Sequence, residues 1–177
     1  GILAITGYYT TGGGQGAPLR DHAYEGLVED CENRGKVSAK ENVGGISGWG
    51  GFILNCRNQA EIVSTATISH LDSTSCVGGI MGKCYQGNCA AVECENTGKV
   101  SGVKYVGGIV GYFARHKDSY PEKIAGCKNS GYVVGVGFVG GIVGCVNREL
   151  IKESTNTGTV QGMYSYGDIY GELVVED

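Results

Sequence analysis

The stretch CENTGKVSG at residues 94–102, followed by VGGIVGY at 106–112, decides the fold because the chain repeats it. CENRGKVS at 31–38 is nearly identical, and VGGI recurs after each of these two copies. Aligned on the asparagine of the Cys-x-Asn pattern, the copies lie 25 to 38 residues apart. The aligned asparagines are Asn33, Asn58, Asn96, Asn129 and Asn156. A constant order of parts with a loose period is typical of repeat architectures, in which insertions map to loops.

Each copy contains three short segments that we predict to be β-strands. The first ends at the cysteine, as in LVEDC at 27–31, the second is KVS at 99–101 or its equivalent, and the third contains VGGI. Val, Ile and aromatic residues are enriched in these segments, and turn residues separate them. A helical interpretation fails, since the chain has 33 Gly and each would cost a helix about 1 kcal/mol against Ala.

Three short strands cannot bury a hydrophobic face alone, whereas stacked copies bury one against each other. We therefore predict an all-β fold, a parallel β-solenoid with three short strands per coil and about five coils. Right-handed winding is expected, because parallel crossovers are overwhelmingly right-handed. The competing folds are a β-sandwich and a β-propeller, but a propeller blade carries four strands in roughly 40 residues.

The whole chain, 1–177, is expected to form one solenoid domain. Its units are expected at residues 1–26 (partial), 27–52, 53–90, 91–123, 124–149 and 150–177. GILA at 1–4 matches GISG at 45–48, and LVVED at 173–177 resembles LVED at 27–30. We therefore expect a fragment of a longer surface protein, or a domain capped by neighbouring elements. Bare strand edges at the ends would favour end-to-end self-association.

Composition narrows the classes of function. Two Pro among 33 Gly exclude collagen, and 41% hydrophobic residues argue against disorder. The net charge of −4 and the absence of a Lys/Arg cluster give little support to a nucleic-acid partner. Since no apolar stretch approaches the roughly 18 residues of a transmembrane helix, we expect no membrane insertion.

Four of the eight cysteines occupy one repeat position and should stack as a structural column: Cys31, Cys56, Cys94 and Cys127. Ser154 fills the same position in the last copy, which suits a small buried residue, so we favour reduced thiols over disulfides here. Cys84 and Cys89 bracket a short loop and are expected to form a local disulfide. Cys76 and Cys145 have no evident partner. Without a Cys-x-x-Cys motif, we expect no metal site.

Inserted loops are where recognition is expected, because binding residues concentrate on loops held by a scaffold. The candidate ligand-binding residues follow the third VGGI segment: Tyr112, Phe113, Arg115, His116 and Tyr120. A second insertion covers 65–75. The alternative interpretation is a solvated loop without a ligand. Zincin, esterase-elbow and phosphate-loop motifs are missing, so we expect no catalytic residue, no cofactor and no enzymatic activity.

The unit Cys-x-Asn-Thr-Gly-x-Val-Ser-Gly, then Val-Gly-Gly-Ile-Val-Gly-Tyr, resembles the GLUG-motif repeat region of bacterial cell-surface proteins. The motif is carried by 94–112 and, less completely, by 127–145. The resemblance implies an extracellular or cell-surface location in bacteria, within adhesins or beside metallopeptidase domains whose zinc motif lies outside the repeats. The chain departs from the pattern at QAEI 59–62, which lacks the glycine, and at DIY 168–170 in place of GIV.

Three hypotheses for function stay open. The first is a non-catalytic extracellular module, a rigid spacer or an adhesive surface that binds a glycan or a host protein through inserted loops beside neighbouring domains. The second is a part of a secreted carbohydrate-active enzyme or peptidase. The third is a subunit of a self-assembling filament.

Overall fold

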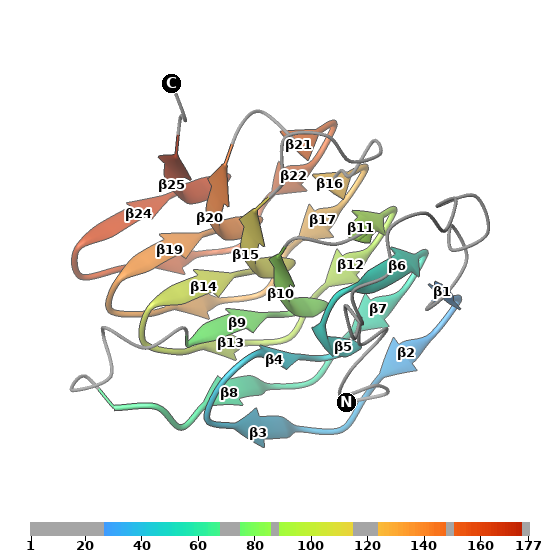
Figure 1. Ribbon diagram of the computed structural model, residues 1–177, viewed down its shortest axis with the longest axis horizontal. Helices are drawn as coiled ribbons and strands as arrows, with labels where there is room; N and C mark the ends of the chain where they lie inside the picture. The colour runs from blue at the N-terminus through green and yellow to red at the C-terminus, as the bar shows by residue number, and fades with distance from the viewer. Residues whose placement is uncertain (1–26, 68–74, 86–88, 115–123, 148–150, 175–177) are drawn as a thin grey trace, which may run out of the picture.

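The computed structural model describes residues 27–67, 75–85, 89–114, 124–147 and 151–174, which form an all-β, parallel β-solenoid (Figure 1). The strands are short and lie in five sheets of five strands. Each pass of the chain through the five sheets is called a coil below, and the coils stack from coil one at the bottom of Figure 1 to coil five at the top. Within the described part, no helix is long and apolar enough to cross a membrane.

Every coil contributes one strand to every sheet. Coil one contains β1 (Leu27–Glu29), β2 (Glu32–Asn33), β3 (Val37–Ala39), β4 (Val43–Gly44) and β5 (Ser47–Trp49). Coil two contains β6 (Gly51–Leu54), β7 (Arg57–Asn58), β8 (Ile62–Ser64), β9 (Cys76–Gly78) and β10 (Met81–Tyr85). Coil three contains β11 (Cys89–Val92), β12 (Glu95–Asn96), β13 (Val100–Ser101), β14 (Tyr105–Gly107) and β15 (Val110–Ala114). Coil four contains β16 (Ile124–Ala125), β17 (Lys128–Asn129), β18 (Val133–Val134), β19 (Phe138–Gly140) and β20 (Val143–Asn147). Coil five contains β21 (Ile151–Lys152), β22 (Thr155–Asn156), β23 (Val160–Gln161), β24 (Ser165–Gly167) and β25 (Tyr170–Val174).

The sheets are numbered here by their strand in coil one, so that sheet one is β1-β6-β11-β16-β21 and sheet five is β5-β10-β15-β20-β25. Neighbouring strands are always parallel and always five apart in chain order. From β1 to β21 the chain makes four complete turns, and β21 to β25 carry it on through all five sheets. The predicted parallel β-solenoid is confirmed.

The prediction of three strands per coil is wrong, because each coil has five. The turn after the cysteine itself contains a two-residue strand, as at Glu95–Asn96. The VGGI segment divides into two strands, since the chain bends sharply between Gly107 and Val110. A Cβ atom on Gly107 would run into the backbone of Val110, so only glycine fits this bend. The expected units starting at residues 53 and 91 begin two residues late, because β6 starts at Gly51 and β11 at Cys89.

A left-handed corner residue separates sheet one from sheet two in every coil. The backbone torsion φ is 54° at Asp30, 49° at Asn55, 54° at Glu93, 62° at Gly126 and 48° at Glu153. Each of these residues directly precedes the cysteine position or its serine equivalent. Glycine and asparagine tolerate this conformation, whereas a glutamate is strained in it.

Two columns of apolar side chains fill the interior. The main cluster lies between sheets one and five and includes Ile53, Met81, Val110, Phe113 and Ile124, all at most 1% exposed. The second cluster lies between sheets three and four and consists of Val43, Ile62, Val77, Val100, Val106, Val133 and Val139. Fully burying one Val or Ile contributes about 1.5–3 kcal/mol, so stacking the coils supplies what a single coil lacks. The predicted inward columns of Val and Ile are confirmed.

The asparagine column runs along the whole solenoid and consists of Asn33, Asn58, Asn96, Asn129 and Asn156. In coils one to four, Nδ2 donates to the Oδ1 of the asparagine in the next coil over 2.7 or 2.8 Å, and in coil five Asn156 Nδ2 donates to Asp168 Oδ1 over 2.7 Å. Each Nδ2 also donates to the carbonyl oxygen two residues further along its own coil. Both amide protons therefore have acceptors, which buried polar groups require.

Candidate functional site

The structure places two of the five predicted ligand-binding residues, and both lie in strand β15 rather than in a loop. Phe113 is completely buried in the main core cluster, so its assignment to a binding surface is corrected: it is a core residue. Tyr112 is only half-buried and points away from that core. Arg115, His116 and Tyr120 lie outside the described residues.

Tyr112 belongs to a column of side chains on sheet five that faces away from the main core. Across the parallel strands Lys83 pairs with Trp49 on one side and with Tyr112 on the other. The column continues from Tyr112 to Cys145 and then to Glu172. Trp49 is 41% exposed, whereas Lys83 beside it is only 9% exposed.

Sheet four contributes a second column to the same region. Its register brings Cys76, Tyr105, Phe138 and Ser165 into line, on the side opposite the buried valines. The Tyr105 and Phe138 rings stack with their centroids 5.5 Å apart and 15° between their planes. The Tyr105 ring also lies 5.0 Å from that of Tyr112, tilted by 53°, which joins the two columns. Aromatic pairs in such arrangements attract each other beyond their area burial.

Two lysines complete what is called the aromatic cluster below: Trp49, Tyr105, Tyr112 and Phe138 with Lys83 and Lys104. The Lys83 ammonium lies 5.0 Å from the centre of the Trp49 ring and 5.7 Å from that of Tyr112. The Lys104 ammonium lies 5.1 Å from the Tyr105 ring centre. Cations at these distances are attracted to the ring faces. Both lysines are therefore held against aromatic rings.

The thiols and the phenol at the cluster are poor nucleophiles. The Cys145 thiol donates to Oε2 of Glu172 over 3.5 Å, and burial, followed by the Glu172 charge, raises the pKa of Cys145. Burial raises the pKa of Cys76 to about 12 and that of Tyr105 to about 12. These groups are protonated at neutral pH, and a thiol reacts as its thiolate. The region thus offers aromatic ring faces and the partly exposed Lys104 for binding, whereas the Cys76 and Cys145 thiols are buried.

Asn42 stands at the coil-one end of this region. It directly precedes β4, so the register of sheet four continues the Cys76 column to it. Its backbone has a φ of 50° and passes close to Gly82, the neighbour of Lys83. Among the buried side-chain oxygen and nitrogen atoms of the described residues, Asn42 Oδ1 is the one without a hydrogen-bond partner. A buried acceptor of this kind is costly unless a donor reaches it.

Other parts of the described surface are weaker candidates for a binding site than the aromatic cluster. In the described residues, no group of three or more His, Cys, Asp or Glu side chains is placed to hold a metal ion. A pocket of about 220 Å³ lies at the left-handed corner of coils one and two, lined by Asp30, Cys31, Glu32, Asn55 and Arg57. Asn55 Nδ2 already donates to Asp30 Oδ1 there over 2.6 Å, and the charged groups of Glu32 and Arg57 pair with Arg34 and Glu95.

The cysteine column lies in the interior beside the main core. Its four members, Cys31, Cys56, Cys94 and Cys127, carry free thiols. The Cys56 thiol donates to the Leu54 carbonyl over 3.3 Å and accepts from the Cys31 backbone N–H over 3.4 Å. Ser154 makes equivalent bonds through its hydroxyl, to the Lys152 carbonyl and from the Cys127 N–H. Burial raises the pKa of Cys56 to about 11, which favours the neutral thiol.

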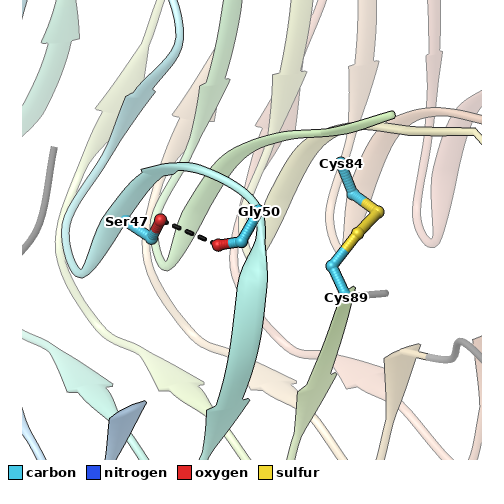
Figure 2. Close-up of a disulfide and its surroundings, with 4 residues drawn as sticks. All are labelled: Ser47, Gly50, Cys84 and Cys89. Carbon is cyan, nitrogen blue, oxygen red and sulfur yellow. Dashed lines mark hydrogen bonds between the residues drawn. A yellow bond between two sulfur atoms is a disulfide. The ribbon is translucent and has the colours of Figure 1, made fainter. Parts of the chain in front are cut away.

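The disulfide joins Cys84 at the end of sheet five to Cys89 at the start of sheet one, the pairing expected from the sequence. Figure 2 shows it beside the corresponding corner of coil one, where the Ser47 hydroxyl donates to the Gly50 carbonyl over 2.9 Å. Gly50 has a φ of 67°, which favours glycine. The same corner is therefore closed by a hydrogen-bonded glycine turn in one coil and by a covalent bond in the next.

The sequence reasoning missed Trp49, Lys83, Tyr105 and Phe138. A signal was available, because Trp49 and Tyr112 both follow the glycine after the VGGI motif, and Tyr105 and Phe138 both precede VGG. Comparison of the chain with protein-family models, with curated proteins and with solved structures gives no match. Function therefore has to be inferred from the aromatic cluster and its surroundings.

Proposed function

We propose that the protein is a non-catalytic, adhesive repeat module that binds a glycan on the aromatic cluster. The observation that carries the proposal is the gathering of four aromatic rings and Lys83 from two sheets, with Lys104 directly before β14, on the side facing away from both core clusters. A sugar ring has an apolar C–H face and a hydroxyl-bearing edge. Ring faces and fixed polar groups in one place match both.

The spacing of the cluster suits an extended ligand. Trp49 and Tyr112 lie two strands apart on sheet five, roughly 9.6 Å at the usual strand spacing. Lys83 lies between them and is held by their rings, so its conformation needs little ordering when a ligand arrives.

The proposal includes display outside a bacterial cell, as part of a right-handed GLUG-type repeat region. It is supported by the repeated Cys-x-Asn and VGGI motifs and by the Cys84–Cys89 disulfide, a bond that persists in oxidising compartments. A stiff stack of coils would also serve as a spacer between neighbouring domains.

Trp49 makes the proposal directly testable, because it is the one tryptophan of the sequence. Titration of the full chain with a panel of neutral and acidic oligosaccharides is expected to give, for one class, a saturable change in Trp49 emission. Tyr112→Ala should weaken that binding about tenfold or more, in the range of a lost stacking contact. Tyr132→Ala removes a tyrosine directly before β18, away from the aromatic cluster, and is the matched control, expected to bind as the parent does.

Two further variants separate the cluster from the insertion predicted from the sequence. If that insertion carries recognition, His116→Ala and Tyr120→Ala abolish binding while Tyr112→Ala leaves it intact. The proposal also fails if no oligosaccharide of the panel changes the Trp49 emission and none is retained in a glycan-array assay with the same protein.

A further inference from the structure

The second glycine of each VGGI motif makes room for the asparagine column. A Cβ atom would lie 2.8 Å from Asn58 Oδ1 if built on Gly45, and 2.6 Å from Asn156 Nδ2 if built on Gly141. A Cβ atom built on either of the equivalent glycines of coils two and three, Gly79 and Gly108, would come equally close to Asn96 or Asn129. In each case the asparagine belongs to the coil that follows the glycine in the chain. The glycine of one coil therefore leaves space for the asparagine side chain of the next coil.

Coil five has Asp168, rather than a glycine, at this position. The residue occupies the position of Gly141, one coil further on, as the pairing of Gly140 with Gly167 shows. Its Oδ1 accepts a hydrogen bond from Asn156 Nδ2 over 2.7 Å. In the inner coils, that amide proton goes to the Oδ1 of the next asparagine, as from Asn129 to Asn156. The Asp168 carboxylate thus replaces the next member of the column.

We infer that Asp168 is a built-in stop: its side chain completes the asparagine column and prevents a further coil from stacking in register on coil five, whether from a longer chain or from a second copy. Two physical reasons support this. The Asp168 side chain fills the space that a following asparagine would need. Its carboxylate can only accept hydrogen bonds, so it would oppose the Oδ1 of an incoming amide.

The inference is independent of the proposed glycan site, because Asp168 is not part of the aromatic cluster.

The test adds a sixth coil. A copy of residues 151–174 is appended after Asp177, so that 175–177 form a connection as long as 148–150. It is made with Asp168 of coil five kept, and with Asp168→Gly. We expect amide exchange in the appended coil to be about tenfold or more slower in the Asp168→Gly chain than in the chain with Asp168.

Equal exchange in the two chains, whether protected or unprotected, would overturn the inference. Asp168→Asn keeps the size of the side chain and removes its charge, so it should leave the appended coil unprotected, and protection there would count against the inference as well. A second measurement needs no added coil. In the unextended protein, Asp168→Gly should speed exchange of the Asn156 Nδ2 protons in NMR spectra, and unchanged exchange would show that Asp168 is not their acceptor.

Discussion

Asn58 and Asn96 are 38 residues apart in the chain, yet Asn58 Nδ2 lies 2.7 Å from Asn96 Oδ1 and donates to it. Both side chains are completely buried. The bond holds coil two and coil three in one register, because a slip by a single residue would leave both amides without partners. The asparagine column therefore contributes specificity as well as stability.

Removing one inner member of the column should be more harmful than removing its first member. Asn96→Ala deletes two column bonds and strands the Asn58 amide, and we expect a loss of about 2–4 kcal/mol in the free energy of unfolding. Asn33→Ala deletes one column bond at the edge and should cost less than half as much. Urea unfolding of both variants measures the difference, and equal losses would contradict a continuous column.

The glycines of the VGGI motif should tolerate no side chain. Gly108→Ala places a Cβ atom 2.8 Å from Asn129 Nδ2 and against the Gly141 backbone, so we expect the loss of at least about 3 kcal/mol, or failure to fold. Gly35→Ala is the control, since the nearest atom to its Cβ is 4.0 Å away. The control should change the midpoint of urea unfolding little, and similar effects of the two substitutions would refute this packing argument.

The left-handed corner offers a route to higher stability. Glu93 has a φ of 54°, a conformation that asparagine adopts at lower cost, and Asn55 already occupies the equivalent corner. Glu93→Asn should therefore raise the free energy of unfolding by about 0.5–1 kcal/mol. Glu95→Asn, two residues later in a strand, should not raise it. A thermal melt of both variants decides, and an unchanged or lower melting temperature for Glu93→Asn would count against strain at this corner.

Because Cys56 is a buried thiol, we expect the free energy of unfolding to fall at alkaline pH. The pKa of Cys56 is raised from 9.0 to about 11, so the folded state keeps a proton that the unfolded chain gives up first. This contribution is fully present below pH 9 and is lost as the pH rises towards 11. Urea unfolding at about pH 8 and about pH 10 should show a drop, and Cys56→Ser should make that drop smaller. An identical drop in the variant would exclude Cys56 as a cause.

Much of the fold could be predicted from the sequence because alignment of the repeats indicates which residues lie beside each other on neighbouring strands. Five aligned asparagines with cysteine or serine before them identify equivalent positions, and stacking equivalent positions already implies parallel strands in register. The number of strands per coil could not be read in this way. Strands of two residues, such as Glu95–Asn96, carry no alternation to detect, and the bend after Gly107 depends on backbone contacts within the VGGI segment.

The candidate site was harder to predict, since its rings are brought together by two sheets. Tyr112 and Tyr105 lie on opposite sides of the VGGI bend, and that bend sets their rings 5.0 Å apart. Phe113 was assigned to the surface because it adjoins an insertion, although the strand continues through it and turns it inward. Periodicity locates columns, whereas the angle between two sheets decides which columns meet.

In coils one to four, each Nδ2 of the asparagine column points towards the coil that follows it in the chain. Until that next coil forms, the amide has a proton donor without an acceptor, and the next stretch of polypeptide brings the oxygen that accepts it. Because residues leave the ribosome in that same order, each new coil can form on the coil that has already folded before it.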